Sequence, residues 1–155
     1  MSAPSSAESK MRSLALMDTT MRGLLFNPAN NTFRWFDRQM QPNYIEQGTC
    51  VRIRRISTEQ YYTMGGRMAL TRPHFQLDVL DSDPEVAASA ALAVINFLGR
   101  INIVTDTAFD SPPTSPSSFP TFILSQRSGL EAQRQPNLPL PVESIDFRIF
   151  ASEPT

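Results

Sequence analysis

The amino-acid sequence predicts a single α+β domain: an antiparallel sheet of four or five strands, two packed helices and long proline-rich loops. A chain of 155 residues is most simply one domain, and it is long enough to bury a core. Residues 49–80 show the two-residue alternation of strands on either side of a glycine pair, and residues 83–98 carry the signals of a helix. Because these local signals agree with one another, we expect a folded core of two strands and a helix.

The first expected element is a helix over residues 7–25. The spacing Ser5-Ser6-Ala7-Glu8 fits a capping box, and Asn27-Pro28 would end the helix. Apolar residues recur between these limits at steps of three and four, at Leu14, Met17, Met21 and Leu24. We interpret this stripe as core; an adaptable methionine-lined binding groove is the alternative.

A strand pair is expected at residues 49–80, after a turn and loop in which Phe33–Asp37 could form a short strand. The first strand is Thr49–Ser57, where Val51 and Ile53 alternate with arginines. The glycines of Met64-Gly65-Gly66-Arg67 supply the positive φ of a tight reversal, and Phe75–Val79 alternates as the second strand.

A helix follows directly at residues 83–98. In Ser82-Asp83-Pro84-Glu85 either the serine or the aspartate can cap the helix, proline fits its first turn, and Gly99 is a natural stop. The face expected to pack on the sheet consists of Val86, Ala90, Val94 and Phe97.

The rest of the chain alternates proline-rich connections with strands. Residues 105–121 form a proline-rich loop that can be neither helix nor central strand, and residues 129–141 form a second connection of this kind. Strands are expected at Phe122–Arg127 and Ile145–Phe150. We expect these two to pair as an antiparallel hairpin within residues 122–151.

Composition limits the function classes. The net charge is -1 and the pI is about 5.8, so no general basic field attracts nucleic acid or acidic lipid. Lys10 is the only lysine among 14 basic residues; arginine is enriched in protein interfaces and lysine is depleted there. No stretch approaches the roughly 20 apolar residues of a membrane span. The polar N-terminus resembles no secretory signal, so we expect synthesis in the cytoplasm.

Residues for catalysis or metal binding are few. His74 is the only histidine and Cys50 the only cysteine, so a clustered zinc site has no ligand set, and any Ser–His or Cys–His pair would depend on His74. Asp78, Asp81 and Asp83 lie close in sequence but lack the glycine and distal glutamate of a calcium loop. We expect no enzyme activity, no metal and no cofactor.

The arginines of the first strand allow two interpretations. Arg52, Arg54 and Arg55, with Tyr61 and Tyr62, could bind single-stranded nucleic acid by phosphate contact and stacking. Alternatively, they could pair with carboxylates across the sheet or across a subunit boundary. We favour pairing, because a nucleic-acid-binding domain normally carries a basic excess.

The order of these elements resembles the tail terminator (tail completion) proteins of long-tailed bacteriophages. The motifs that carry the resemblance are Ile53-Arg54-Arg55-Ile56-Ser57-Thr58, the Met64-Gly65-Gly66 turn, Arg72-Pro73-His74-Phe75-Gln76-Leu77-Asp78-Val79, the helix Ala87–Leu92, and Ser144-Ile145-Asp146-Phe147-Arg148-Ile149. They cover roughly residues 52–98 and 122–150.

The resemblance implies an α+β virion subunit at the head–tail junction. Such a subunit assembles with its own copies into a hexameric ring on the tail tube protein, stops tube polymerisation and contacts a head-completion (stopper) protein. DNA would pass through the ring lumen without sequence-specific contact. Another neck subunit of the head–tail connector is the nearest alternative.

For such a ring, we expect the Gln60–Thr71 loop to reach toward the lumen or the tube, and the proline arms to contact adjacent subunits or the layer above. The residues expected at interfaces are Arg52, Arg54, Arg55, Tyr61, Tyr62, Met64, Arg67, Met68, Arg72, Pro112, Pro113, Pro116, Arg127 and Arg134.

Overall fold

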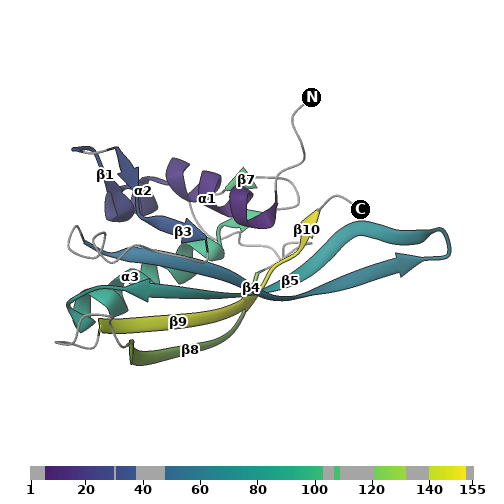
Figure 1. Ribbon diagram of the computed structural model, residues 1–155. Helices are drawn as coiled ribbons and strands as arrows, with labels where there is room; N and C mark the ends of the chain where they lie inside the picture. The colour runs from purple at the N-terminus through teal and green to yellow at the C-terminus, as the bar shows by residue number, and fades with distance from the viewer. Residues whose placement is uncertain are drawn as a thin grey trace.

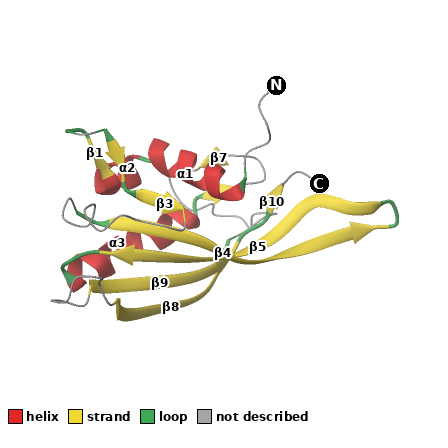
Figure 2. Ribbon diagram, viewed as in Figure 1, coloured by secondary structure: helices red, strands yellow, loops and turns green. Residues whose placement is uncertain are grey.

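The fold is that of an α+β domain, as predicted, and the described part of the chain forms three helices and one main sheet (Figure 1). The computed structural model describes residues 6–29, 31–37, 48–102, 107–108, 121–131 and 140–152. Figure 2 shows helices α1 and α2 beside β3 and α3 behind the main sheet.

The main sheet has the strand order β3-β4-β5-β9-β8. The short strand β10 also pairs with β5, at residues of β5 that precede those paired with β9. Its strands are β3 (Trp35–Asp37), β4 (Cys50–Thr63), β5 (Gly66–Leu80), β8 (Phe122–Glu131), β9 (Leu140–Arg148) and β10 (Ala151–Ser152). All neighbours are antiparallel except β3 and β4, which run parallel, so the sheet is mostly antiparallel, in agreement with the predicted fold class. The expected antiparallel pairing of the last two long strands is confirmed in β8 and β9.

Two small strand pairs lie outside the main sheet. They are β1 (Phe26–Asn27) with β2 (Thr32–Phe33), and β6 (Ile101–Asn102) with β7 (Thr107–Ala108). β7 lies inside the segment 105–121 that was expected to be loop throughout.

The N-terminal helix is two helices, α1 (Ala7–Met17) and α2 (Thr19–Leu25), so the single helix predicted over residues 7–25 was wrong. Asp18 has an extended backbone, with φ -75° and ψ 128°, and its carboxylate accepts a hydrogen bond from the Met21 backbone N–H. Aspartate is a strong helix N-cap, and this cap starts a new helix where the apolar spacing alone predicts continuation. The break also explains why Met17, predicted as core, is 79% exposed.

Helix α3 (Pro84–Leu98) begins and ends close to the predicted residues. Asp83 provides the cap, since its carboxylate accepts from the Glu85 N–H at 3.0 Å, and Gly99 is the C-cap. The packing face differs from the prediction at one position: Val86 is 42% exposed, and the neighbouring Ala87 is buried instead.

One core joins the three helices to the inner face of the sheet. Strand residues Val51, Ile53, Leu77 and Ile145 are fully buried in the same cluster as residues of all three helices. Trp35 meets Phe97 edge-on with ring centroids 6.1 Å apart. All three helices therefore cover one face of the sheet, and the opposite face is left to polar side chains.

The β4–β5 hairpin is longer than predicted and projects from the body (Figure 1). β9 pairs with β5 only from His74 to Leu80, and β10 pairs only with Leu70 and Thr71. Residues 58–72, which we call the arm, are thus mostly a two-stranded ribbon. An isolated two-stranded ribbon is only marginally stable in water, so the arm depends on its anchorage at the body.

Candidate interaction surfaces

The arm tip exposes large apolar side chains. Gly66 adopts φ 123°, the conformation that the predicted glycine turn requires. Tyr62 is 70% exposed and Met64 is fully exposed. Arg67 lies opposite Tyr62 in the strand register, and Met68 follows it in β5; their side chains lie outside the described part of the chain.

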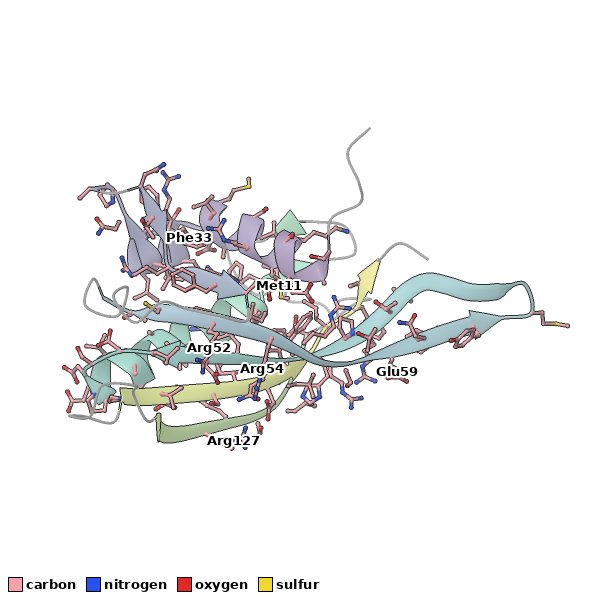
Figure 3. All side chains as sticks on the ribbon, viewed as in Figure 1. Met11, Phe33, Arg52, Arg54, Glu59 and Arg127 are labelled. Carbon is pink, nitrogen blue, oxygen red and sulfur yellow. The ribbon has the colours of Figure 1, made fainter. Side chains whose placement is uncertain are left out.

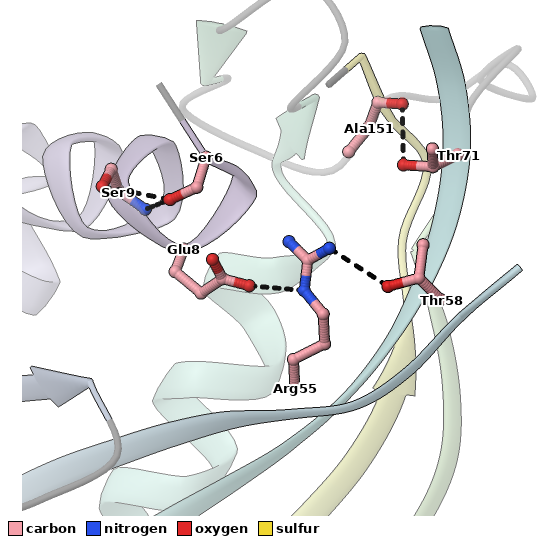
Figure 4. Close-up of polar contacts among 7 residues, drawn as sticks. All are labelled: Ser6, Glu8, Ser9, Arg55, Thr58, Thr71 and Ala151. Carbon is pink, nitrogen blue, oxygen red and sulfur yellow. Dashed lines mark hydrogen bonds and ion pairs between the residues drawn. The ribbon is translucent and has the colours of Figure 1, made fainter. Parts of the chain in front are cut away.

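The base of the arm is fixed on its inner side by Arg55 (Figure 4). Its guanidinium donates to Glu8 in α1 at 2.7 Å and to the Thr58 hydroxyl at 3.1 Å, and it lies 5.3 Å from the Phe75 ring centroid. Arg55, predicted at an interface, is therefore occupied within its own subunit. The strand register shifts between Arg55 and Ser57, and such irregularities bend a strand.

On the outer side of this base, Glu59 lies between two arginines. Its carboxylate is 3.8 Å from both Arg72 in β5 and Arg148 in β9. Further along, the Thr71 hydroxyl donates to the Ala151 carbonyl at 3.4 Å, which holds β10 against the arm (Figure 4). Contacts on both sides thus set the direction in which the arm leaves the sheet.

The outer face of the sheet pairs arginines with acceptors across strands. Arg52 lies 2.8 Å from Asp78, Arg54 donates to Gln76 at 2.6 Å, and Arg127 lies 3.5 Å from Asp146. Figure 3 shows Arg52, Arg54 and Arg127 on the sheet, with Glu59 further out toward the arm. The predicted carboxylate partner is therefore present for Arg52, whereas the partner of Arg54 is the side-chain amide of Gln76.

The residues proposed for nucleic-acid stacking are not brought together. Arg54 and Tyr62 are eight residues apart on one strand, a separation of roughly 26 Å at the rise of a β-strand. The strand arginines Arg52 and Arg54 belong to the sheet body, whereas the exposed Tyr62 belongs to the arm tip. The geometry does not form one basic and aromatic platform.

The candidate catalytic residues are also apart. Cys50 pairs with Leu80, six residues along β5 from His74, which corresponds to roughly 20 Å. Among the described residues, no group of three or more His, Cys, Asp or Glu side chains is placed to hold a metal ion.

The three neighbouring aspartates have separate structural partners. Asp78 binds Arg52 and the Ser144 hydroxyl. The buried Asp81 accepts from the Thr49 hydroxyl at 2.6 Å and from the Asp83 N–H at 2.9 Å. These contacts hold the start of β4 to the turn before α3, so the carboxylates serve folding.

A groove that the sequence did not predict lies between α2 and α3. Its volume is about 560 Å³, and the glycine and apolar residues of its lining are Gly23, Leu24, Val86, Ala90 and Ala93. Among the described residues, the charged ones that line it are Asp83 and Glu85, at the start of α3. The one feature of the sequence that could have indicated this groove is Gly23, because glycine is unfavourable in the middle of a helix.

The outer edge of the sheet is the ten-residue strand β8, where Ile123 and Leu124 are exposed. An edge strand presents unpaired backbone groups and can accept a partner strand. The other predicted interface residues, Pro112, Pro113, Pro116 and Arg134, lie outside the described residues.

Comparison with known proteins gives no family for this chain. No protein-family model matches the sequence, and no curated protein matches it significantly. Across the described residues, the helices are too short or too polar to cross a lipid bilayer.

Proposed function

We propose that this chain is a non-enzymatic structural subunit of a phage virion, the tail terminator, which forms a ring on the end of the tail tube. In that position it ends tube polymerisation and joins the tail to a head-completion protein. The observation that carries the proposal is the arm, a projecting hairpin whose tip exposes Tyr62 and Met64.

The arm costs conformational free energy that the subunit alone does not recover. Ordering a ribbon that buries little of its own surface loses conformational entropy with little hydrophobic return. Tyrosine and methionine are both enriched at the centres of protein interfaces. An anchored ribbon with such a tip is therefore suited to dock on another protein, and the Arg55–Glu8 pair keeps it oriented for docking.

The ring itself is supported by the asymmetry of the subunit and by the resemblance of the sequence motifs to tail terminators. A ring requires head-to-tail interfaces in which two different surfaces of each copy meet. The arm supplies one of these surfaces, and the body supplies the other. We also propose that the ring is a hexamer, that it binds the tail tube protein and that it lies at the head–tail junction.

Imaging of virions that carry a label on this subunit tests the location. The label is expected at the head–tail junction and nowhere else on the particle. A label along the tail shaft, at the tail tip or on the capsid surface would contradict the proposal. If the label lies at the junction but the subunit does not limit the length of the tail tube, the result would favour another neck subunit.

A nucleic-acid-binding module is the second candidate, and a titration in increasing salt separates it from the first. That candidate requires an affinity for single-stranded DNA that falls steeply with salt. With the outer-face arginines paired and the overall charge negative, we expect no such affinity.

A further inference from the structure

We infer that the arm tip of one copy docks in the α2–α3 groove of the next copy, and that this contact closes the ring. The inference rests on the proposed function, because it specifies how neighbouring subunits of the ring hold one another. It assigns the tip to a neighbouring subunit, whereas the resemblance directs it to the lumen or the tube.

The groove matches the tip in size and polarity. Its volume of about 560 Å³ is within the range of pockets that bind small groups, and five of its lining residues are glycine or apolar. Methionine is unbranched and flexible, so it fills irregular apolar spaces well. Met64, fully exposed at the turn, is the side chain that would enter.

Gly23 lines the groove and is costly to its own helix. A glycine inside a helix is less favourable than alanine by about 1 kcal/mol. At Gly23 the φ is not positive, and an added Cβ would meet no atom within 4 Å. Because neither the backbone conformation nor the packing within the subunit requires glycine here, the free space is available to a group from outside.

The charges of the two surfaces are complementary. Asp83 and Glu85 are the charged residues of the groove lining, and both are exposed. In the tip, residues 61–68 contain one charged residue, Arg67, and no acidic residue. A cationic tip that meets an acidic rim favours this pairing over contact between two tips or two grooves.

The positions of the two surfaces fit a ring. Figure 1 shows the arm tip at one end of the molecule, and α2 with the start of α3 at the other. Two complementary surfaces at opposite ends give a heterologous contact, which repeats from copy to copy and closes when the rotation permits.

Disulfide trapping tests the contact in the full chain. The double variant Gly23→Cys with Met64→Cys is incubated with tail tubes, oxidised with copper phenanthroline and run on a denaturing gel without reductant. The native Cys50 is buried and does not interfere. A ladder of covalent oligomers is expected, with at least tenfold more cross-linked product than in the control.

The matched control pairs Met64→Cys with Leu124→Cys on the exposed edge of β8. A ladder in this control, and not in the groove variant, would place the tip on the sheet edge and overturn the inference. Rings visible by electron microscopy without a ladder in the groove variant would also overturn it, while the proposed function stands. Absence of rings from wild-type protein on tail tubes would overturn both.

Discussion

The Arg55 guanidinium on β4 donates a 2.7 Å hydrogen bond to the Glu8 carboxylate on α1, across 47 residues of sequence. Both side chains are largely removed from solvent, and the same guanidinium reaches Thr58 and lies over Phe75 (Figure 4). A planar donor group is needed to make these contacts together. The pair therefore joins the first helix to the base of the arm.

The variant Arg55→Lys is expected to lower the free energy of unfolding by about 1–2 kcal/mol, because lysine cannot reproduce the forked hydrogen bonds. The matched control is Arg54→Lys on the exposed outer face, with an expected loss of less than about 0.5 kcal/mol. Urea denaturation followed by circular dichroism measures both. Equal losses of unfolding free energy in the two variants would show that the contacts of Arg55 stabilise the fold no more than those of the exposed Arg54.

The tip variants Tyr62→Ser and Met64→Ser should leave folding stability within about 0.5 kcal/mol of wild type, since both side chains are exposed in the subunit. Assembly on tail tubes should be reduced at least tenfold, because these side chains are proposed to be buried only in the ring. Thermal denaturation and negative-stain microscopy give the two readouts. Normal rings from a protein that carries both Tyr62→Ser and Met64→Ser would contradict a role for the tip in assembly.

Gly23 offers a pair of substitutions that should both preserve folding but have opposite effects on assembly. Gly23→Ala should raise the free energy of unfolding by about 1 kcal/mol and leave assembly intact, because a Cβ has room there. Gly23→Leu should also preserve folding but fill the groove and prevent assembly. Urea denaturation and ring counts on tail tubes distinguish the effects. Rings from Gly23→Leu in wild-type yield would rule out the groove as the docking site.

The buried thiol of Cys50 should make the folding stability depend on pH in the alkaline range. Burial raises the pKa of its thiol from 9.0 to about 12; the nearby Arg34 lowers this pKa and Asp81 raises it. Above pH 9 the unfolded chain loses the thiol proton and the folded chain keeps it. The Cys50 contribution to stability is thus fully present below pH 9 and is lost as the pH rises toward 12, by up to about 1.4 kcal/mol per pH unit.

Urea denaturation at pH 8, 9 and 10 measures this loss, with Cys50→Ala as the reference that lacks the thiol. The wild type should lose stability faster than the variant above pH 9. Parallel curves for the two proteins would contradict the raised pKa. In the folded protein at pH 8, the thiol should also resist Ellman's reagent until denaturant is added.

Local sequence signals predicted the central unit well. The alternation around Val51 and Ile53, the glycine turn and the Asp83–Gly99 helix limits all depend on neighbouring residues, and all appear in the structure. The length of the hairpin was underestimated, because residues 58–72 do not alternate regularly and pair almost entirely within the arm.

The features that sequence analysis missed depend on tertiary context. Asp18 breaks a helix whose apolar spacing continues through it, so Met17 was assigned to the core and lies exposed. On α3, Val86 was also assigned to the core, and Ala87 is buried in its place. The parallel pairing of β3 with β4 is a non-local choice without a local signal. The α2–α3 groove arises only when two helices distant in sequence pack together, and Gly23 alone could have hinted at it.

The most direct test of the central claim is the length of tail tubes polymerised with and without this protein. Purified tail-tube protein polymerised alone should give open-ended tubes of widely varying length. Addition of the wild-type chain should arrest elongation, with a ring on one end of each tube in electron micrographs. Tubes that grow equally long with the protein present, and that carry no ring at either end, would contradict the account.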